Sequence, residues 1–243
     1  MSRVPEQVLG HPAIQRLKRI AQALGELNSL VVFIGGAISP LLQTEPPFDE
    51  PRPTKDVDGV IASTKYSDLG PLHDALRAHG FRQMPGETKH IHRWYSSTDD
   101  VFDLVPAGAH PGGSGQVWDR LALDTCVQAD LGDGIVIRHA SAPAFLGLKW
   151  AAYADRGAQD PFGSHDLEDI VALVASRATV AAEVYASPAG LRAFVVEQTL
   201  ALLNDARLED LLAGHLNNAQ DPVASIDVVR SRLVRIGRLG ELS

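Results

Sequence analysis

Cysteine is almost missing from this sequence of 243 residues. Cys126 is the only one, which excludes an internal disulfide and any zinc site built on cysteines. There is no run of about 18 uncharged apolar residues, so we expect no transmembrane helix. Residues 1–6 lack the apolar core of a signal peptide. These absences predict a cytoplasmic protein that does not act on a membrane.

Positive charge is also in short supply. The chain has 22 lysines and arginines against 30 aspartates and glutamates, which gives a net charge of −8. This balance argues against a broad nucleic-acid-binding surface, although it is compatible with a local basic groove. The hydrophobic content of 45% is ordinary for a globular protein, and the length fits one large domain or two modest ones.

Strand patterns are confined to the first 140 residues. Apolar or alternating runs there predict strands at 30–34, 56–62, 91–95, 101–105, 125–129 and 135–138, and helical spacing predicts helices at 11–28, 37–42 and 66–80. Later residues show only helical spacing, at 144–156, 165–177, 188–204 and 222–239. We therefore predict an α+β fold, with a mixed β-sheet and flanking helices over residues 1–140 and a helical domain over residues 141–243.

Two aspartates at alternate positions open the expected strand at 56–62. Residues i and i+2 of a strand lie on the same face, so Asp56 and Asp58 place two carboxylates side by side. Carboxylates this close repel each other unless a cation lies between them, and hard oxygen ligands suit Mg²⁺. The alternative is a polar strand start with two solvated aspartates, because D-x-D is a short and common pattern.

A glycine pair and a third aspartate accompany this pattern. Gly35 and Gly36 follow the expected strand at 30–34 and precede a helix, so their backbone amides can approach a phosphate. Asp103 interrupts an apolar strand, where it suits a general base and can complete a site for two divalent ions that bind a triphosphate. Taken singly, the glycines are also explained as a plain tight turn, and Asp103 as a strand-edge residue satisfied by backbone donors.

This order of motifs resembles the nucleotidyltransferase superfamily of the DNA polymerase β type. More narrowly, R-P-T-K-D-V-D at residues 52–58 resembles the R-x-T-x-D-x-D of AbiEii-like nucleotidyltransferases, many of which are toxins of bacterial toxin–antitoxin systems. F-D-L-V-P at residues 102–106 matches the strand that carries the family's third aspartate. The sequence departs from the family in a proline-rich loop at 43–51 and in D-P-F-G-S at 160–164, which bear on the acceptor more than on the chemistry.

The resemblance continues into the helical region. Residues 146–157 resemble the family's helix with a fixed lysine, and residues 165–170 resemble its D-x-x-D-I motif. Lys149 fits a cation that binds phosphate, with a solvated helix lysine as the alternative. Asp166 and Asp169 share a helix face and either orient Lys149 or contact the nucleotide. For Asp166 an interaction with the helix dipole is a further alternative.

The resemblance implies a Mg²⁺-dependent nucleotidyltransferase, which moves a nucleoside monophosphate from an NTP to a hydroxyl. It implies that Asp56, Asp58 and Asp103 bind the metal, and that these three and Lys149 are the catalytic residues. The residues expected to contact the nucleotide are Gly35, Gly36, Thr54, Lys55, Lys149, Asp166 and Asp169. The expected acceptor is tRNA or a protein, and the expected partner is a cognate antitoxin. A small-molecule acceptor, as in antibiotic-modifying nucleotidyltransferases, and a non-catalytic nucleotide-binding module are the alternatives.

Two histidines near the third expected strand carry a weaker signal. His90 and His92 alternate and are spaced like half of a metal site. The sequence offers no third ligand for them, so we favour an exposed strand face.

Overall fold

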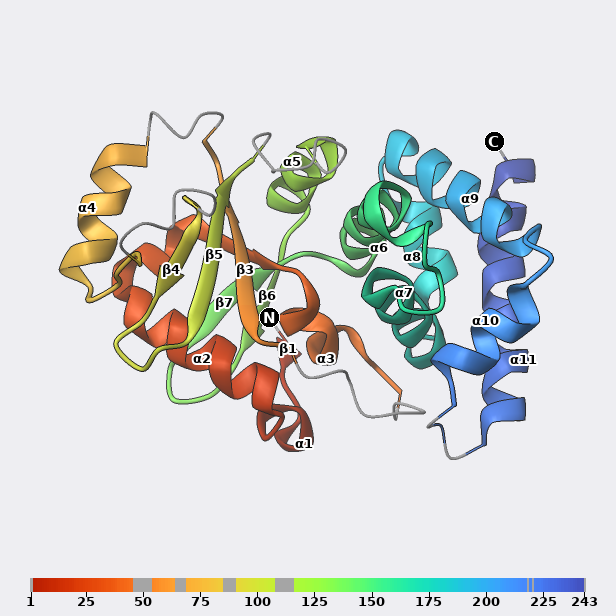
Figure 1. Ribbon diagram of the computed structural model, residues 1–243, viewed down its shortest axis with the longest axis horizontal. Helices are drawn as coiled ribbons and strands as arrows, with labels where there is room; N and C mark the ends of the chain where they lie inside the picture. Colours follow the sequence, from red (N-terminus) through yellow and green to blue (C-terminus); the bar gives the residue numbers. More distant parts are fainter. Residues whose placement is uncertain are drawn as a thin grey trace. The chain divides into compact units, whose positions relative to one another are not determined.

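The computed structural model describes residues 2–45, 54–63, 69–84, 91–107, 116–217, 219 and 221–242. The chain divides into two units (Figure 1). The first comprises Met1–Leu41 and Arg52–Ser141, and the second comprises Leu42–Pro51 and Ala142–Ser243. Every strand among the described residues belongs to the first unit, and the described part of the second is helical.

One mixed sheet forms the centre of the first unit (Figure 1). Its strands are β1 (Ser2–Arg3), β2 (Val31–Ile34), β3 (Asp56–Ile61), β4 (Arg93–Tyr95), β5 (Val101–Pro106), β6 (Val127–Asp130) and β7 (Val136–His139). They are ordered β1-β6-β7-β2-β3-β5-β4. β3 and β5 are parallel, whereas β2 and β3, β4 and β5, and β6 and β7 are antiparallel. The predicted α+β class with a mixed sheet is confirmed.

The middle of the sheet is held by apolar side chains on one face of β2, β3 and β5. Val57 is paired with Phe102, and both are fully buried. The rings of Phe33 and Phe102 lie 6.3 Å apart between centroids. Burying one such side chain stabilises a fold by about 1.5–3 kcal/mol, so this contact fixes the strands against one another. In the same register, β3 pairs with β5 so that Val57 lies opposite Phe102 and Asp58 opposite Asp103.

Helices pack around this sheet: α1 (Glu6–Leu9), α2 (Pro12–Leu24), α3 (Ser39–Leu42), α4 (Gly70–Ala78) and α5 (Gln116–Asp124). α2 packs against β3, and α5 packs against β2 and β3. α2 buries apolar residues at spacings of three and four, as its pattern predicted. It ends at Leu24, before the predicted end at residue 28, because Gly25 has a φ of +55° and a 3₁₀ turn follows over Gly25–Leu30. α5 is a helix that the sequence analysis missed.

The second unit contains α6 (Ala142–Ala152), α7 (His165–Ser176), α8 (Val180–Ala186), α9 (Ala189–Leu203), α10 (Leu208–His215) and α11 (Pro222–Gly237). α6 packs against α7, α8 and α9, and α11 packs against the same three helices. The short helices α8 and α10 were not predicted. Within the described ranges, none of the helices has the length and apolar character that crossing a membrane requires.

Gly59 in β3 is predicted to be essential for this packing. A Cβ at residue 59 would lie 2.7 Å from Cγ1 of Val31 and 3.0 Å from Cε2 of Phe102, two buried side chains. We expect Gly59→Ala to lower the free energy of unfolding by about 1–3 kcal/mol, the usual cost of overpacking a core. Urea denaturation followed by circular dichroism measures this change. Gly70→Ala is the control, because its Cβ would meet nothing within 4 Å. An equal effect of the two substitutions would contradict the packing described.

Candidate active site

Three aspartates form a carboxylate cluster on one face of the sheet: Asp56, Asp58 and Asp103. Asp56 and Asp58 are alternate residues of β3, and the parallel pairing with β5 places Asp58 directly opposite Asp103. The structure therefore brings together the three aspartates that the sequence analysis selected as metal ligands. β5 lies between β3 and β4, so Asp103 is not a strand-edge residue, and that alternative is wrong.

An arginine that the sequence analysis missed contacts this cluster. Arg93 lies on the edge strand β4, directly opposite Asp103. Its guanidinium donates to both carboxylate oxygens of Asp103, with Nε 2.9 Å from Oδ1 and Nη2 2.7 Å from Oδ2. Nη2 also lies 3.5 Å from Oδ2 of Asp56. A bidentate, charge-assisted pair of this kind is among the stronger polar contacts in proteins.

The electrostatics of Arg93 follow from these contacts. The hydrogen bonds to Asp103 outweigh the effect of burial and raise the pKa of Arg93 above its ordinary value, with further attraction from Asp103 and Asp56. Arg93 therefore stays charged at any physiological pH. The side chain of Asp103 is 10% exposed and that of Asp56 is 40% exposed. The cluster is thus closed at Asp103 and open to solvent at Asp56.

His92 lies beside the same carboxylate. Its Nε2 is 4.0 Å from Oδ2 of Asp103, and its side chain is only 14% exposed. The sequence favoured an exposed strand face for His92. This prediction is wrong, because His92 lies just before β4 and its side chain is largely covered beside Asp103. His90, its expected partner in a metal site, lies outside the described residues.

The glycine at position 35 lets the side chain of Asp58 lie close to the backbone that follows β2. Its backbone has φ +72° and ψ −172°, a conformation that is essentially restricted to glycine. A Cβ at residue 35 would lie 2.0 Å from Oδ2 of Asp58, so no side chain fits there. The backbone conformation and the nearby side chain of Asp58 explain the glycine at position 35, and a phosphate contact by the turn stays a prediction. The helix after it is shorter than expected, because a three-residue 3₁₀ turn and the four-residue α3 replace it, so few peptide dipoles are aligned there.

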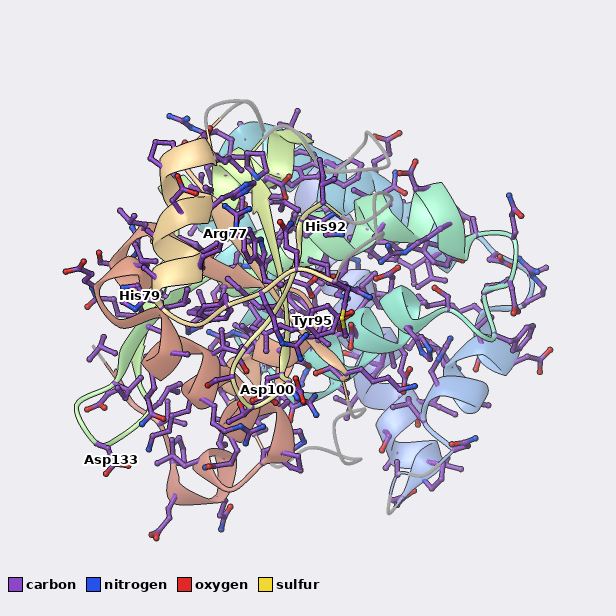
Figure 2. All side chains as sticks on the ribbon, turned by 60° about the vertical axis from the view of Figure 1, so that its left-hand side comes forward. Arg77, His79, His92, Tyr95, Asp100 and Asp133 are labelled. Atoms are coloured by element: carbon purple, nitrogen blue, oxygen red, sulfur yellow. The ribbon has the colours of Figure 1, made fainter. Side chains whose placement is uncertain are left out.

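Two arginines of α2 fix the starts of the strands that carry the cluster. Arg16 donates through Nη1 to the carbonyl of Thr54, and its Nε lies 3.4 Å from Oδ1 of Asp100. Arg19 donates to both oxygens of Asp100 at 2.7 Å. Figure 2 labels Asp100 together with His92 and Tyr95, all from the segment that contains β4 and the start of β5. The contacts of Arg16 and Arg19 with Thr54 and Asp100 were not predicted. They hold the starts of β3 and β5 against α2.

Thr54 and Lys55, which were expected to contact a nucleotide, differ in exposure. Thr54 is buried, and its hydroxyl has no hydrogen-bond partner among the described residues. Lys55 is exposed at the start of β3, one residue before Asp56. Of the two, Lys55 is the side chain open to a ligand from solvent. A nucleotide contact by either residue stays a prediction.

In the second unit, Lys149 belongs to a buried ion-pair network. Its Nζ lies 3.1 Å from Oδ1 of Asp166 and 2.5 Å from Oδ2 of Asp169. Arg156 completes the network, with Nε 2.8 Å from Oδ2 of Asp166. Lys149 is 8% exposed, so the alternative of a solvated helix lysine is wrong. The structure shows Asp166 and Asp169 orienting Lys149, and the contact of Lys149 with phosphate stays a prediction.

In this network Lys149 and Asp166 each favour the charged form of the other. Burial disfavours the ammonium of Lys149, but the attraction of Asp169 and Asp166 outweighs it and raises the pKa of Lys149. Burial likewise disfavours the carboxylate of Asp166, but the hydrogen bonds from Arg156 and the attraction of Lys149 lower the pKa of Asp166. Both groups are therefore charged at neutral pH. Two cations face two carboxylates, which leaves the network without net charge.

The carboxylate cluster suits Mg²⁺ by the chemistry of its donors but not by their present placement. Its three aspartates supply hard oxygen donors of the kind that Mg²⁺ prefers. In the part of the chain that the structure describes, however, no group of three or more His, Cys, Asp or Glu side chains is placed to hold a metal ion. The guanidinium of Arg93 contacts Asp103 and Asp56 instead. The donors thus fit Mg²⁺, while their present positions are those of carboxylates held by an arginine.

The sequence matches no model of a protein family and no curated protein. Among solved structures, the chain is similar to an antigenic nucleotidyltransferase-like protein from Paracoccidioides brasiliensis. The identity is 18% and the TM-score 0.46, over 89% of this chain and 95% of that one. It is also similar to JHP933 from Helicobacter pylori, with 13% identity and a TM-score of 0.46, over 98% of this chain and 96% of that one. At these values, neither similarity assigns an activity or a role to a residue of this chain.

Gly35→Ala is predicted to disturb Asp58 as well as the backbone. We expect a loss in the free energy of unfolding that exceeds the roughly 1–3 kcal/mol of backbone strain alone. Gly134→Ala is the matched control, because Gly134 has a similar φ of +75° and its Cβ would meet nothing within 4 Å. Urea denaturation of both variants, and of Gly35→Ala combined with Asp58→Ala, separates the two effects. Equal losses in the two single variants would contradict a contact between residue 35 and Asp58.

Lys149→Met is predicted to destabilise the second unit. It leaves Asp169 and Asp166 buried without their common cation, and breaking a buried pair in this way costs about 3–5 kcal/mol. Arg156→Met is the control, because the side chain of Arg156 is 71% exposed and removing an exposed partner costs roughly 1 kcal/mol or less. Thermal and urea denaturation measure both effects. If Lys149→Met is no more destabilising than Arg156→Met, the network does not hold the unit together.

Proposed function

We propose that the chain is a Mg²⁺-dependent nucleotidyltransferase, which moves a nucleoside monophosphate from an NTP to a hydroxyl group. The observation that carries the proposal is the carboxylate cluster on β3 and β5, beside a turn at which Asp58 permits only glycine. A cluster of carboxylates repels a triphosphate unless divalent cations join the two. The cluster therefore supports the binding of a nucleotide together with a divalent metal ion rather than of a nucleotide alone.

The transfer breaks one phosphorus–oxygen bond and forms another. The acceptor oxygen bonds to the α-phosphorus of the NTP, and the bond from that phosphorus to the oxygen bridging the β-phosphate breaks. Pyrophosphate leaves with the electron pair of that bond, and the proton of the acceptor hydroxyl passes to a base, for which Asp103 is suited. Asp56, Asp58 and Asp103 would hold Mg²⁺. When bound, the ion neutralises phosphate charge and orients the reacting groups.

Other residues are proposed to hold the triphosphate. The glycine turn at Gly35 and Gly36 exposes backbone amides beside Asp58 that can donate to phosphate oxygens. Lys55 adds an exposed cation at the start of β3. A contact of Lys149, which Asp166 and Asp169 orient, with a phosphate is a separate proposal that rests on the resemblance of residues 146–157.

We further propose that the acceptor is tRNA or a protein, and that the chain is a toxin restrained by a cognate antitoxin. The support for this role is the resemblance of residues 52–58 to the R-x-T-x-D-x-D motif of AbiEii-like toxins. The net charge of −8 bears on the choice of acceptor. A tRNA would have to bind through a local basic region, because the protein as a whole repels a polyanion.

One observation favours a second candidate, a nucleotide-binding module without catalysis. Arg93 already neutralises part of the cluster, and both oxygens of Asp103 accept its hydrogen bonds. If this ion pair is permanent, Asp103 is neither a free base nor a metal ligand. The fold would then bind a nucleotide without turning it over.

Transfer is tested by incubating the full chain with each α-labelled NTP and Mg²⁺, alone, with total tRNA and with cellular protein. We expect Mg²⁺-dependent release of pyrophosphate and label on one class of acceptor. Asp56→Ala should abolish the reaction, and Asp103→Asn should lower its rate by about 10²–10⁴-fold, the usual contribution of a general base. Asp133→Asn is the control, because the side chain of Asp133 is 81% exposed and lies outside the cluster.

The position of the label decides between the acceptors. Label on RNA or on protein supports the respective acceptor, and turnover that needs an added small hydroxyl compound supports the antibiotic-type alternative. Nucleotide binding without turnover, under every acceptor condition, supports the non-catalytic module. Absence of both binding and turnover contradicts the proposed function.

A further inference from the structure

Arg93 is placed where a cation is required. The carboxylate cluster gathers three negative charges on one face of two adjacent strands. Arg93 comes from the neighbouring strand β4, in the position paired with Asp103, so it lies on the same face. It is the counter-charge that the structure provides to Asp103 and Asp56 together.

The guanidinium uses the same oxygens that a metal ion would need. Nη2 lies 2.7 Å from Oδ2 of Asp103 and 3.5 Å from Oδ2 of Asp56. It thus lies in contact range of both carboxylates, in the region that an ion shared by the two would take. A bound Mg²⁺ sits roughly 2.0–2.1 Å from its oxygen ligands and carries two positive charges, so it would repel a guanidinium on the same oxygens.

The environment of Arg93 allows it to leave. β4 is a three-residue edge strand, and the side chain of Arg93 is 27% exposed. An arginine side chain has several rotatable bonds, and its guanidinium is weakly hydrated and well suited to anionic oxygens such as those of a phosphate. Partial exposure and rotatable bonds are the properties that an exchange of the Arg93 side chain away from the carboxylates requires.

We infer, on the basis of the metal-dependent transfer proposed above, that Arg93 is a positioning residue that exchanges with the divalent cation. In the metal-free protein it holds Asp103 and Asp56 together in place of the ion. Binding of the ion with its nucleotide displaces the guanidinium and frees the oxygens of Asp103.

The exchange predicts that removing Arg93 strengthens metal binding. Mn²⁺ serves as the probe, because its electron paramagnetic resonance signal reports the free ion during a titration of the full chain. We expect Arg93→Gln to bind Mn²⁺ roughly tenfold or more tightly than the wild type, since a competing positive charge has been removed from the ligands. Arg93→Lys keeps a charge but not the bidentate geometry, so its affinity should lie between the two.

Arg207→Gln is the matched control. Arg207 also donates to both oxygens of one aspartate, Asp205, at 3.0 and 2.8 Å, but both residues belong to the second unit and lie outside the carboxylate cluster. Its removal should leave Mn²⁺ affinity unchanged. An equal gain in Arg207→Gln and Arg93→Gln would overturn the inference, because it would reflect the change in net charge alone.

The outcomes also separate this inference from the proposed function. If the wild type binds Mn²⁺ and Arg93→Gln binds it equally or more weakly, the exchange is overturned and the metal-dependent function stands. If neither protein binds Mn²⁺ at millimolar concentrations, both are overturned. In that event Asp58→Asn, which should abolish binding in a true site, would also change nothing.

A second readout uses the wild-type protein and does not depend on the folding of Arg93→Gln. The Nε–H resonance of Arg93 in a ¹H–¹⁵N spectrum is assigned by its loss in Arg93→Lys. Its hydrogen bond to Asp103 should break on saturation with Mg²⁺, which shifts the resonance and accelerates its exchange with water. An unchanged Nε–H resonance in the metal-saturated protein would overturn the exchange.

Discussion

Mutual repulsion of the three carboxylates is the constraint on which the site depends. Two unit charges about 4 Å apart near a protein surface interact by about 4 kcal/mol, so ionised aspartates that lie close together are stabilised by a nearby cation. In this structure Arg93 is the nearby cation, because its guanidinium contacts both Asp103 and Asp56. An arginine therefore holds two of these carboxylates, and within the described residues the three aspartates are not arranged as a ready metal site.

The framework of the first unit keeps these oxygens together. A shift of β3 by one residue would turn Asp56 and Asp58 to the opposite face, where Val57 and Phe102 are now buried. The apolar face of the strands thus fixes the polar face. Arg16 and Arg19 add a second restraint by joining the starts of β3 and β5 to α2. The contacts that stabilise the sheet are therefore also the contacts that fix the geometry of the site.

Local patterns were sufficient to predict part of this arrangement. Alternation along β3 placed Asp56 and Asp58 on one face, and the lone polar residue in β5 singled out Asp103. The partner of Asp103 could not be predicted, because it depends on the register between β4 and β5. That register follows from the turn at residues 96–100, where Asp99 has a φ of +60° and Ser96 bonds to Asp100. Such a turn cannot be derived from hydrophobic spacing.

The pairing of Lys149 with Asp166 and Asp169 was one of the two roles predicted for these aspartates, whereas the burial of Lys149 was not predicted. Almost every other residue of α6 is apolar, which indicates a helix covered on all sides, and a lysine in such a helix needs a partner. Asp166 and Asp169, three residues apart on α7, supplied the nearest candidates. Arg156 lies within the predicted helix 144–156, in the π-helical segment Tyr153–Gly157 that continues α6, but the sequence analysis did not name it as a partner of Asp166. Short helices such as α8 and α10 are too brief for their periodicity to predict.

The central proposal is that the carboxylate cluster binds a divalent cation in exchange for Arg93. The most direct measurement is a crystal structure of the protein with Mn²⁺ and a non-hydrolysable NTP, in which anomalous scattering locates the ion. The account predicts an anomalous peak between Asp56, Asp58 and Asp103, with the guanidinium of Arg93 detached from Asp103. A bound nucleotide without an ion at the cluster, and with the Arg93–Asp103 pair intact, would contradict it.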